Sequence, residues 1–463
     1  MFVIEAILGF IVQFISNPTI LIALIVLIGL LIQKKKWNDL LRGTVKTIVG
    51  FTLISCGSTI VIGAVTPMSD MMQGIFGFTG TLPVNESCFA VASAQFGTAL
   101  SGIMAIALVV NLVLARFSKF KFIYLTGHEI MWISTVCAIS LGALGFPIWQ
   151  VLICGGLITG TYMAVFPALI YKSVCKVTGV KDLAVGHSGI VYYWIGGLIA
   201  KVTGNKDKDA EKINMSKSLN VLRDLTISLS LAMTLVYILI SVLCMVQQPE
   251  LAAATFGGTN FIIFSITYGV QFAVSIYVIQ SGVRMIVAEL VPAFKGVAEK
   301  FIKNAVPALD IPILYPYQPN SVLIGFLCAA IGGVLAFFLQ LALAGTALEL
   351  PLILPSLFTA FFYGATVGCV ANKEGGLRGV IISSLLTGFI IALFPALLIK
   401  FGGVNVEGTT FGGADATVVG MFNTQVGGTI GSTGFLAASV LVFLAPIIYS
   451  VLTKNKPGFT EEA

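Results

Sequence analysis

Ionisable side chains inside apolar stretches are the residues of this sequence best placed to do chemistry. Only 10% of the 463 residues are charged, and the chain has two histidines. Ionisable groups at membrane depth are energetically costly and are usually functional. Those within or beside apolar stretches are Glu86, His128, Glu129, His187, Asp310, Glu349, Glu407 and Asp415.

Three of these positions give the strongest chemical signals. His128 and His187 each follow a glycine, in TGHEIMW (126–132) and VGHSG (185–189). Asp310 is surrounded by prolines, which exclude a continuous helix and expose backbone polar groups to a ligand.

Shorter polar residues extend this set. Glu86 and Ser87 lie in the polar segment PVNES before a long apolar stretch, and Gly57 and Ser58 lie in LISCGSTIV. Carboxylates accept hydrogen bonds from hydroxyl groups, and imidazole both donates and accepts. These groups predict a site for a polyhydroxylated ligand, in which a histidine or aspartate could also act as a base toward a hydroxyl.

Each of these residues also has a purely structural interpretation. His128 could cap backbone groups at the membrane interface, and Glu86 could belong to an external loop. Asp415, in the Gly-rich segment GGADA, is balanced between the two interpretations. Glu349 and Glu407 are more simply explained as solvated loop charges.

Other kinds of function find no support in the sequence. No two of the eight cysteines are close enough in sequence to form a metal-binding or redox pair. The Gly-rich stretches lack the lysine and spacing of a phosphate loop. The net charge of +6 comes from basic residues in short loops between apolar stretches, so it does not indicate nucleic-acid binding. We therefore expect no cofactor, no metal ion and no nucleic acid.

The elements that position these residues are predicted to be membrane-spanning helices. The chain is 57% hydrophobic, whereas soluble domains are about 45–50% apolar and about 25% charged. A helix needs about 20 apolar residues to cross the bilayer. On this basis we predict eleven spans, at residues 16–33, 43–65, 98–116, 122–143, 148–171, 219–246, 260–283, 321–346, 352–371, 379–400 and 432–453.

The basic residues orient this scheme. With Lys34 to Lys36 in the cytoplasm, alternation leaves only Lys400, of 26 lysines and arginines, on the outer side. The positive-inside rule therefore places the N-terminus outside and the C-terminus inside. The N-terminus lacks the features of a cleaved signal peptide. We expect residues 1–463 to form a single integral membrane domain.

Three segments do not fit simple spans. Residues 183–200 and 411–430 are Gly-rich and moderately apolar, and we predict that each is a re-entrant hairpin. Such backbone is tolerated at membrane depth only where protein or a water-filled cavity surrounds it. Residues 284–303 mix charged and apolar residues at helical spacing, which predicts a separate interfacial amphipathic helix.

The two halves of the chain resemble each other. FPALIYK at 166–172 is echoed by FPALLIK at 394–400, and the same offset relates His187 to Asp415. Nearly the same offset relates Glu86 to Asp310. An odd number of spans between equivalent points inverts the second copy, as in alternating-access transporters. We place the first repeat at about 16–200, the second at about 219–430, and the final span after them at about 432–453.

Several stretches in order resemble a known family, the ascorbate-specific permeases, which are the enzyme IIC components of the bacterial phosphotransferase system. The likeness lies in RGTVKTIVGF, LTGHEIM, VGHSG, QSGVRMIVAEL, ALDIPILYPYQPN and VGCVANKEGG. A more distant likeness runs to galactitol permeases of the same superfamily.

The resemblance implies a homodimer in the bacterial cytoplasmic membrane. Each protomer would have eleven spans, with a V-shaped dimerisation domain (spans one, two, six and seven) and a core domain carrying the hairpins. The core would move relative to the V. A separate enzyme IIB, phosphorylated by enzyme IIA, would phosphorylate the substrate at the cytoplasmic face. Because nothing soluble follows Lys454, we expect no fused IIA or IIB domain. The chain would then be the transporter component of a phosphotransferase.

The resemblance also implies a substrate site. His128, His187 and Asp310 stand in matching motifs, and Gly57 and Ser58 match a glycine-serine pair of that site. The predicted substrate-binding set also includes Glu86 and Ser87. Its last two members, Trp132 and Ser188, stand at positions where the family tends to have glutamine.

Two other classes of function compete with this interpretation. An ion-coupled secondary transporter would use the same inverted repeat and leave its substrate unmodified. An integral membrane enzyme or assembly protein would not transport at all, and the repeat with acids on both sides argues against it. A neighbouring gene for a cysteine-dependent enzyme IIB would favour the phosphotransferase interpretation.

Overall fold

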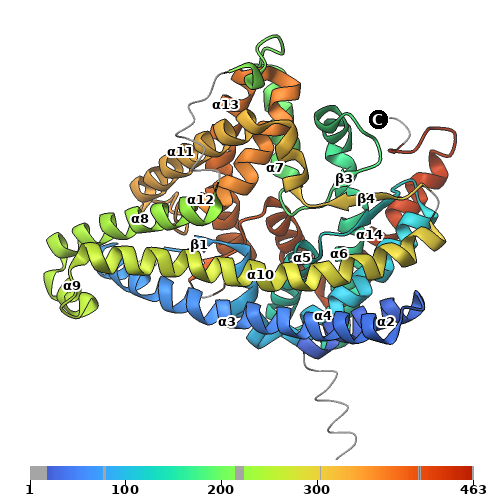
Figure 1. The fold of residues 1–463 in the computed structure, drawn as a ribbon, viewed down its shortest axis with the longest axis horizontal. Coiled ribbons are helices and arrows are strands. Elements are labelled where there is room, and N and C mark those ends of the chain that lie inside the picture. The colour runs from blue at the N-terminus through green and yellow to red at the C-terminus, as the bar shows by residue number, and fades with distance from the viewer. Residues whose placement is uncertain are drawn as a thin grey trace, which may run out of the picture.

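The described part of the chain is mostly helical, and many of the helices are long (Figure 1). The computed structural model describes residues 18–76, 80–213, 224–302, 304–404, 406 and 408–460. Within these ranges the side chains of some helical residues are not described, and Ser58 is one of them.

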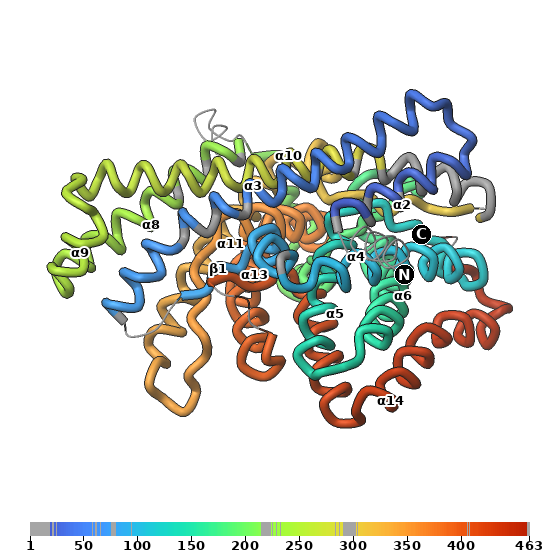
Figure 2. The backbone as a smooth tube through the Cα atoms, turned by 90° about the horizontal axis from the view of Figure 1, so that it is seen from below, coloured from blue at the N-terminus to red at the C-terminus, as the bar shows by residue number. Residues whose placement is uncertain are grey.

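One group of helices lies along one side of the molecule, and we call it the long-helix layer. Figure 2 shows α3 and α10 running side by side along this edge. Glycines allow their backbones to approach closely. A Cβ atom on Gly50 would lie 2.7 Å from the carbonyl oxygen of Gly282, so the two helices meet there. The layer consists of α2 (Pro18–Ile32), α3 (Trp37–Phe76), α8 (Leu225–Gln247), α9 (Pro249–Phe256) and α10 (Phe261–Phe301).

The remaining helices form a second group, the helical core, on the other side of α3 and α10 (Figure 2). Large aromatic side chains such as Trp132, Tyr192 and Phe411 are fully buried in it. A π-helical turn, Ala360–Gly364, joins α12 to α13. The core helices are α4 (Asn85–Phe117), α5 (Gly127–Ala143), α6 (Ile148–Thr178), α7 (Ile190–Thr203), α11 (Pro319–Leu343), α12 (Leu357–Thr359), α13 (Ala365–Gly402) and α14 (Ala414–Leu452).

Two small parallel sheets lie inside the helical core, and the sequence did not predict them. In the first, β4 (Val306–Leu309) lies between β2 (Phe122–Tyr124) and β3 (Ala184–Val185). In the second, β1 (Leu82–Pro83) pairs with β5 (Thr409–Thr410), and Thr81 forms a parallel bridge with Ile353. Each strand leads into a helix within a few residues, except that a 3₁₀ helix, Ile311–Tyr317, lies between β4 and α11.

Each predicted hairpin segment contains the beginning of a helix. Residues 183–200 contain β3 and most of α7, while residues 411–430 contain the first part of α14, which begins at Ala414. That helix is broken at Gly431, which has a positive φ of 67°. One prediction was wrong: residues 284–301 are not a separate helix but continue α10 without a break, because their polar residues do not interrupt the helical hydrogen bonds.

Apolar exposure identifies a multi-pass membrane protein. Among the described residues, eight helices are long and apolar enough to cross a bilayer. Leu231, Leu235 and Leu239, which follow one another at one-turn spacing on α8, are each more than half exposed, as expected of a face that contacts lipid. Helices α2 and α5 are not among these eight, because they have only 15 and 17 described residues. The segment Leu357–Gly402 counts as one of the eight although it is kinked.

The kink in α13 is held open by a loop that follows α7. The Asn205 N–H donates to the Gly375 carbonyl oxygen (2.7 Å), and the Leu377 N–H donates to that of Lys208 (2.7 Å). The loop thus supplies hydrogen-bond partners for backbone groups at the interrupted helix. Gly376 has a φ of +59°, and a Cβ atom there would lie 2.2 Å from the Asn205 carbonyl oxygen.

Polar side chains fasten the same loop to α11 and α13. Asn372 donates to Asp209 (2.7 Å) and accepts from the Ala210 N–H (2.9 Å). Burial opposes the charge on Asp209, but its hydrogen bonds with Asn372 and the Glu211 N–H prevail and lower its pKa. Glu211 in turn accepts from the Ser321 N–H (2.8 Å) in the first turn of α11.

We expect Gly376→Ala to destabilise the protein strongly. With φ 59° and ψ −162°, Gly376 has a backbone conformation that is essentially restricted to glycine and costs other residues about 1–3 kcal/mol. The added methyl group also collides with the backbone of the loop. Gly345→Ala is the matched control, because Gly345 has a φ of +75° and no atom within 4 Å of its Cβ position. The apparent melting temperature of the detergent-purified protein should fall clearly further for Gly376→Ala. Equal shifts would contradict the importance of the loop contact.

Candidate functional site

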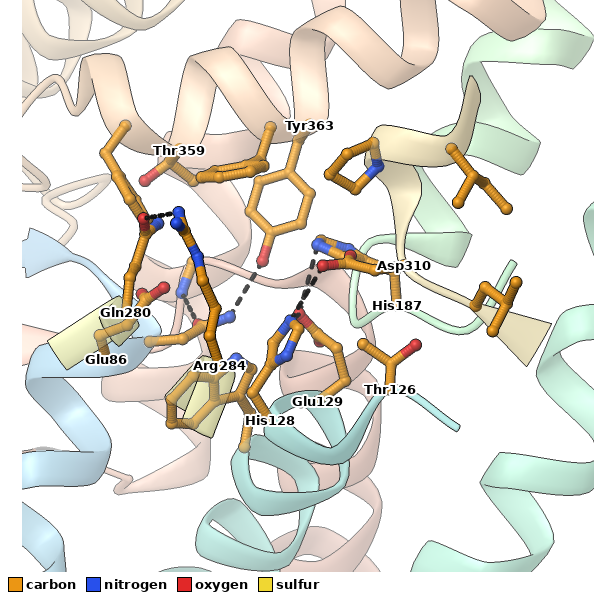
Figure 3. A pocket seen from close by; sticks show the side chains of 18 of the residues that line it. Glu86, Thr126, His128, Glu129, His187, Gln280, Arg284, Asp310, Thr359 and Tyr363 are labelled. Atoms are coloured by element: carbon orange, nitrogen blue, oxygen red, sulfur yellow. Dashed lines mark hydrogen bonds and ion pairs between the residues drawn. The ribbon is translucent and has the colours of Figure 1, made fainter. Parts of the chain in front are cut away.

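A cavity of about 650 Å³ lies between α10 and the helical core (Figure 3). Five of its lining residues are acids or histidines of the core, and they come from four strand-to-helix junctions. This volume suits a small-molecule ligand. The lining residues are Pro83, Asn85, Glu86, Leu125, Thr126, His128, Glu129, Trp132, His187, Gln280, Arg284, Ala288, Leu309, Asp310, Pro312, Ile313, Phe358, Thr359, Phe362, Tyr363 and Gly412.

Four acids of the core lie where helices begin. Glu86, Glu129 and Asp415 lie in the first turns of α4, α5 and α14. The positive end of the helix dipole and the unpaired N–H groups of a first turn favour negative charge. Asp310 likewise caps the 3₁₀ helix, where its carboxylate accepts from the Ile311 N–H (2.8 Å). The junctions therefore explain how several acids are accommodated in an apolar protein.

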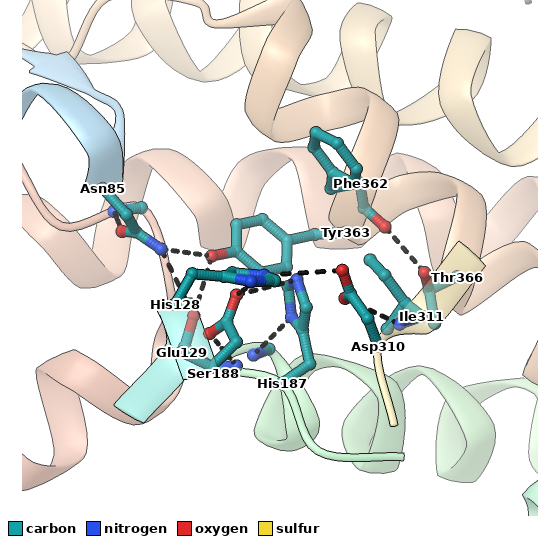
Figure 4. A network of polar contacts seen from close by, with 12 residues as sticks. Asn85, His128, Glu129, His187, Ser188, Asp310, Ile311, Phe362, Tyr363 and Thr366 are labelled. Carbon is teal, nitrogen blue, oxygen red and sulfur yellow. Dashed lines mark hydrogen bonds and ion pairs between the residues drawn. The ribbon is translucent and has the colours of Figure 1, made fainter. Parts of the chain in front are cut away.

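Two histidines and two acids form a connected group at the cavity wall (Figure 4). Nε2 of His187 lies 3.2 Å from Oε1 of Glu129. Nε2 of His128 lies 3.5 Å from the same oxygen and 3.4 Å from Oδ2 of Asp310. The Asp310 side chain is 35% exposed, whereas that of Glu129 is 3% exposed. Asp310 is therefore the acid of this group that a ligand can reach.

Asn85 connects the start of α4 with three other segments at the cavity wall. Its amide nitrogen donates to the Ser188 hydroxyl (3.2 Å) and to the Tyr363 hydroxyl (3.1 Å). Its amide oxygen accepts from the Gly412 N–H (2.8 Å). Tyr363 lies on the π-helical turn, together with Phe362 of the lining. π-Helical turns occur frequently at functional sites.

The wall opposite the core comes from the long-helix layer. Gln280, Arg284 and Ala288 follow one another at one-turn spacing on α10. Arg284 donates to the Gln280 side chain (3.2 Å), as Figure 3 shows. Of the described residues that line the cavity, Arg284 is the only arginine or lysine. The cavity therefore has one permanent positive charge on the α10 wall, opposite the acids of the core.

The structure brings together most of the residues predicted to bind substrate. Glu86, His128, Trp132, His187 and Asp310 all line the cavity, although they come from segments that are far apart in the sequence.

Four predicted residues do not line it. Ser188 is fully buried behind the wall, and Ser87 is buried without a hydrogen-bond partner among the described residues. Gly57 meets α10, where a Cβ atom would lie 2.5 Å from the Ile279 side chain. Ser58 follows it in α3, and its side chain is outside the described part of the structure. Their roles in substrate binding stay predictions.

Asp415 has a structural position instead. Its carboxylate accepts from the N–H groups of Ile190 (3.1 Å) and Val191 (2.9 Å) at the start of α7. The Tyr162 hydroxyl lies 3.0 Å from it. Asp415 therefore joins the beginnings of α7 and α14.

The sequence did not predict several of the residues that line the cavity. Glu129 was recognised as ionisable but not assigned to the site, because its contact with His187 joins two segments that are distant in the sequence. Four others were not predicted because their segments resemble helix ends or apolar core: Asn85, Arg284, Thr359 and Tyr363. Within the described ranges, no group of three or more His, Cys, Asp or Glu residues could hold a metal ion.

Comparison with known proteins gives two findings. A family model described as "PTS system sugar-specific permease component" matches residues 13–415 of the chain, where PTS stands for phosphotransferase system. The chain is also similar to a curated protein of Mycoplasma pneumoniae, "Ascorbate-specific PTS system EIIC component", with 25% identity. That match covers 82% of this chain, and the chain spans 64% of the length of the relative.

Proposed function

Because the chain belongs to the family of sugar-specific permease components of the bacterial phosphotransferase system, we propose that it carries L-ascorbate, or a related sugar acid or polyol, across the cytoplasmic membrane. A separate enzyme IIB, phosphorylated by enzyme IIA, phosphorylates the substrate on the cytoplasmic side. The family match does not favour an ion-coupled transporter that leaves its substrate unmodified. Ascorbate is the first choice because the Mycoplasma relative is named as ascorbate-specific.

The cavity is the observation that carries this proposal. It presents carboxylates, imidazoles and an amide, which accept and donate hydrogen bonds in the directions that a molecule rich in hydroxyl groups needs. Arg284 supplies a positive charge for an acidic sugar derivative. Trp132 and Phe362 supply apolar faces against which the carbon skeleton can pack.

The strand pairing supports the inverted repeat as part of the proposal. The offset from β1 to β4 is nearly equal to the offset from β3 to β5, so these strands occupy equivalent places in the two halves. β4 of the second half lies between two strands of the first half, while β1 of the first half pairs with β5 of the second. This reciprocal pairing is what two copies of one unit, related by symmetry, would produce.

The remaining architecture follows from the same proposal. Eleven spans with two re-entrant hairpins place the N-terminus outside and the C-terminus in the cytoplasm. The long-helix layer corresponds to the V-shaped domain that forms the homodimer, and the helical core carries substrate by moving against α10. The long contact between α3 and α10, and the cavity at the edge of the core, are consistent with this alternating access.

Uptake of labelled ascorbate tests the function directly. The chain is expressed in bacterial cells that lack other ascorbate transporters, with the cognate enzymes IIA and IIB either present or absent. We expect ascorbate phosphate to accumulate only when both enzymes are present. The control is an enzyme IIB whose reactive cysteine has been replaced, which should abolish accumulation.

Other results would redirect the proposal. Unmodified ascorbate accumulating without the two enzymes would identify an ion-coupled transporter. If ascorbate is not taken up but a polyol such as galactitol is phosphorylated, the system stands and the substrate changes.

A further inference from the structure

We propose that Glu129 is a positioning residue that holds both histidines in the orientation in which they meet the substrate. The role of Glu129 in transport rests on the proposed function. Its effect on the orientation and protonation of the two imidazole rings does not. Glu129 lines the cavity, yet its side chain is only 3% exposed, so it acts through its neighbours. Oε1 of Glu129 lies within 3.5 Å of Nε2 of both His128 and His187.

The backbone determines which nitrogen of His187 carries its proton. The Gly189 N–H donates to Nδ1 of His187 (3.2 Å), so Nδ1 must be an acceptor. The Tyr193 hydroxyl, 2.8 Å from Nδ1, therefore also acts as a donor. A neutral imidazole carries one proton, and it must be on Nε2. His187 thus donates from Nε2 to Glu129.

Both oxygens of Glu129 are required as acceptors. Oε2 accepts from the Ser188 N–H (2.6 Å), and Oε1 accepts from Nε2 of His187 (3.2 Å). Neither group can act as an acceptor instead. The Ser188 N–H is a backbone donor, and the Gly189 N–H on Nδ1 keeps the His187 proton on Nε2. A carboxylate meets this demand because it has only acceptors, whereas a glutamine would turn an N–H₂ group toward one of the donors.

Glu129 also offers His128 a second acceptor. Nε2 of His128 is almost equally distant from Asp310 (3.4 Å) and Glu129 (3.5 Å). Because Asp310 is the exposed member, a substrate hydroxyl that binds to it competes with His128. The ring can then donate to Glu129 and keep its place at the wall. Glu129 therefore preserves the histidine pair when the site is occupied.

The histidine content of the chain makes this inference directly measurable. His128 and His187 are its only histidines, so ¹⁵N-histidine labelling of protein purified without a histidine tag yields signals from just two rings. A His128→Gln variant assigns them. We expect His187 in the wild-type protein to be neutral, with the proton on Nε2.

Glu129→Gln is the decisive variant. Its amide cannot accept from both Ser188 and His187, so the Nε2–H signal of His187 should shift or broaden, while Gly189 still holds the proton on Nε2. Uptake efficiency, Vmax/KM, should fall about 10- to 100-fold, as expected when a buried donor is left unpaired. Glu129→Asp keeps two acceptor oxygens and should recover part of both the ring signature and the uptake.

Glu374→Gln is the matched control. Glu374 is also a buried carboxylate, but it bonds with Lys176 at the break in α13 and does not line the cavity. Its replacement should leave both histidine signals unchanged. An unchanged His187 signature in Glu129→Gln would overturn the inference. Because the ring spectra do not require transport, a failure of the ascorbate experiment would leave this test intact.

Discussion

Asp310→Asn is expected to abolish uptake while the protein remains folded. Oδ1 of Asp310 accepts from the Ile311 N–H, and Oδ2 lies 3.4 Å from Nε2 of His128. Asparagine can keep the first contact, but it removes the charge and replaces one acceptor by a donor. Hydrogen bonds to an ionised acceptor are roughly twice as strong as those between neutral groups. We expect uptake of labelled substrate to fall by about 100-fold or more.

The control for Asp310→Asn is the same chemical change at Asp182, an exposed residue in the loop before β3. Asp182→Asn should transport as the wild-type protein does. Both variants should elute as a single, symmetric peak in gel filtration, since the cap of the 3₁₀ helix survives in the first. Normal uptake by a folded Asp310→Asn protein would remove Asp310 from the substrate site.

His187→Ala has the second large expected effect. The change deletes a ring that lines the cavity and leaves the buried Glu129 carboxylate without one of its donors. Removing one donor from a buried charged acceptor is unfavourable, and the lost ring also removes a polar group from the cavity wall. We expect uptake to be lost, together with a lower apparent melting temperature of the purified protein.

A substitution on the neighbouring helix separates these two effects. Val202→Ala removes the most exposed large apolar side chain of α7 and should leave both uptake and melting temperature almost unchanged. His187→Gln restores polar atoms at the ring position and should recover more stability than transport. If His187→Ala transports normally, the ring has a packing role only.

Much of the fold was accessible from the sequence because a membrane imposes simple rules. Long apolar stretches predicted the helices, whereas the two re-entrant hairpins at the glycine-rich segments stay predictions. The short strands were missed because so few residues show no periodicity. Residues 284–303 were separated wrongly from α10, since charged side chains can follow an apolar stretch without ending the helix.

The site residues that could be predicted are those whose ionisable side chains are unusual in an apolar sequence. His128, His187 and Asp310 are conspicuous as ionisable groups in an apolar chain, and all three line the cavity. The role of Glu129 was hidden because it depends on the Gly189 N–H and the Ser188 N–H, which no spacing rule connects to residue 129. Tyr363 lies in the aromatic run AFFYG, which resembles ordinary core packing.

The position of β4 between β2 and β3 constrains how the protein is made. Val306 leaves the ribosome long after Tyr124, and synthesis of the chain between them takes roughly 10 to 40 s at typical rates of translation. Until then, β2 and β3 have no strand between them, and the backbone groups that pair with β4 lack that partner. Neither half should fold when synthesised alone, and two separately translated halves should rescue each other.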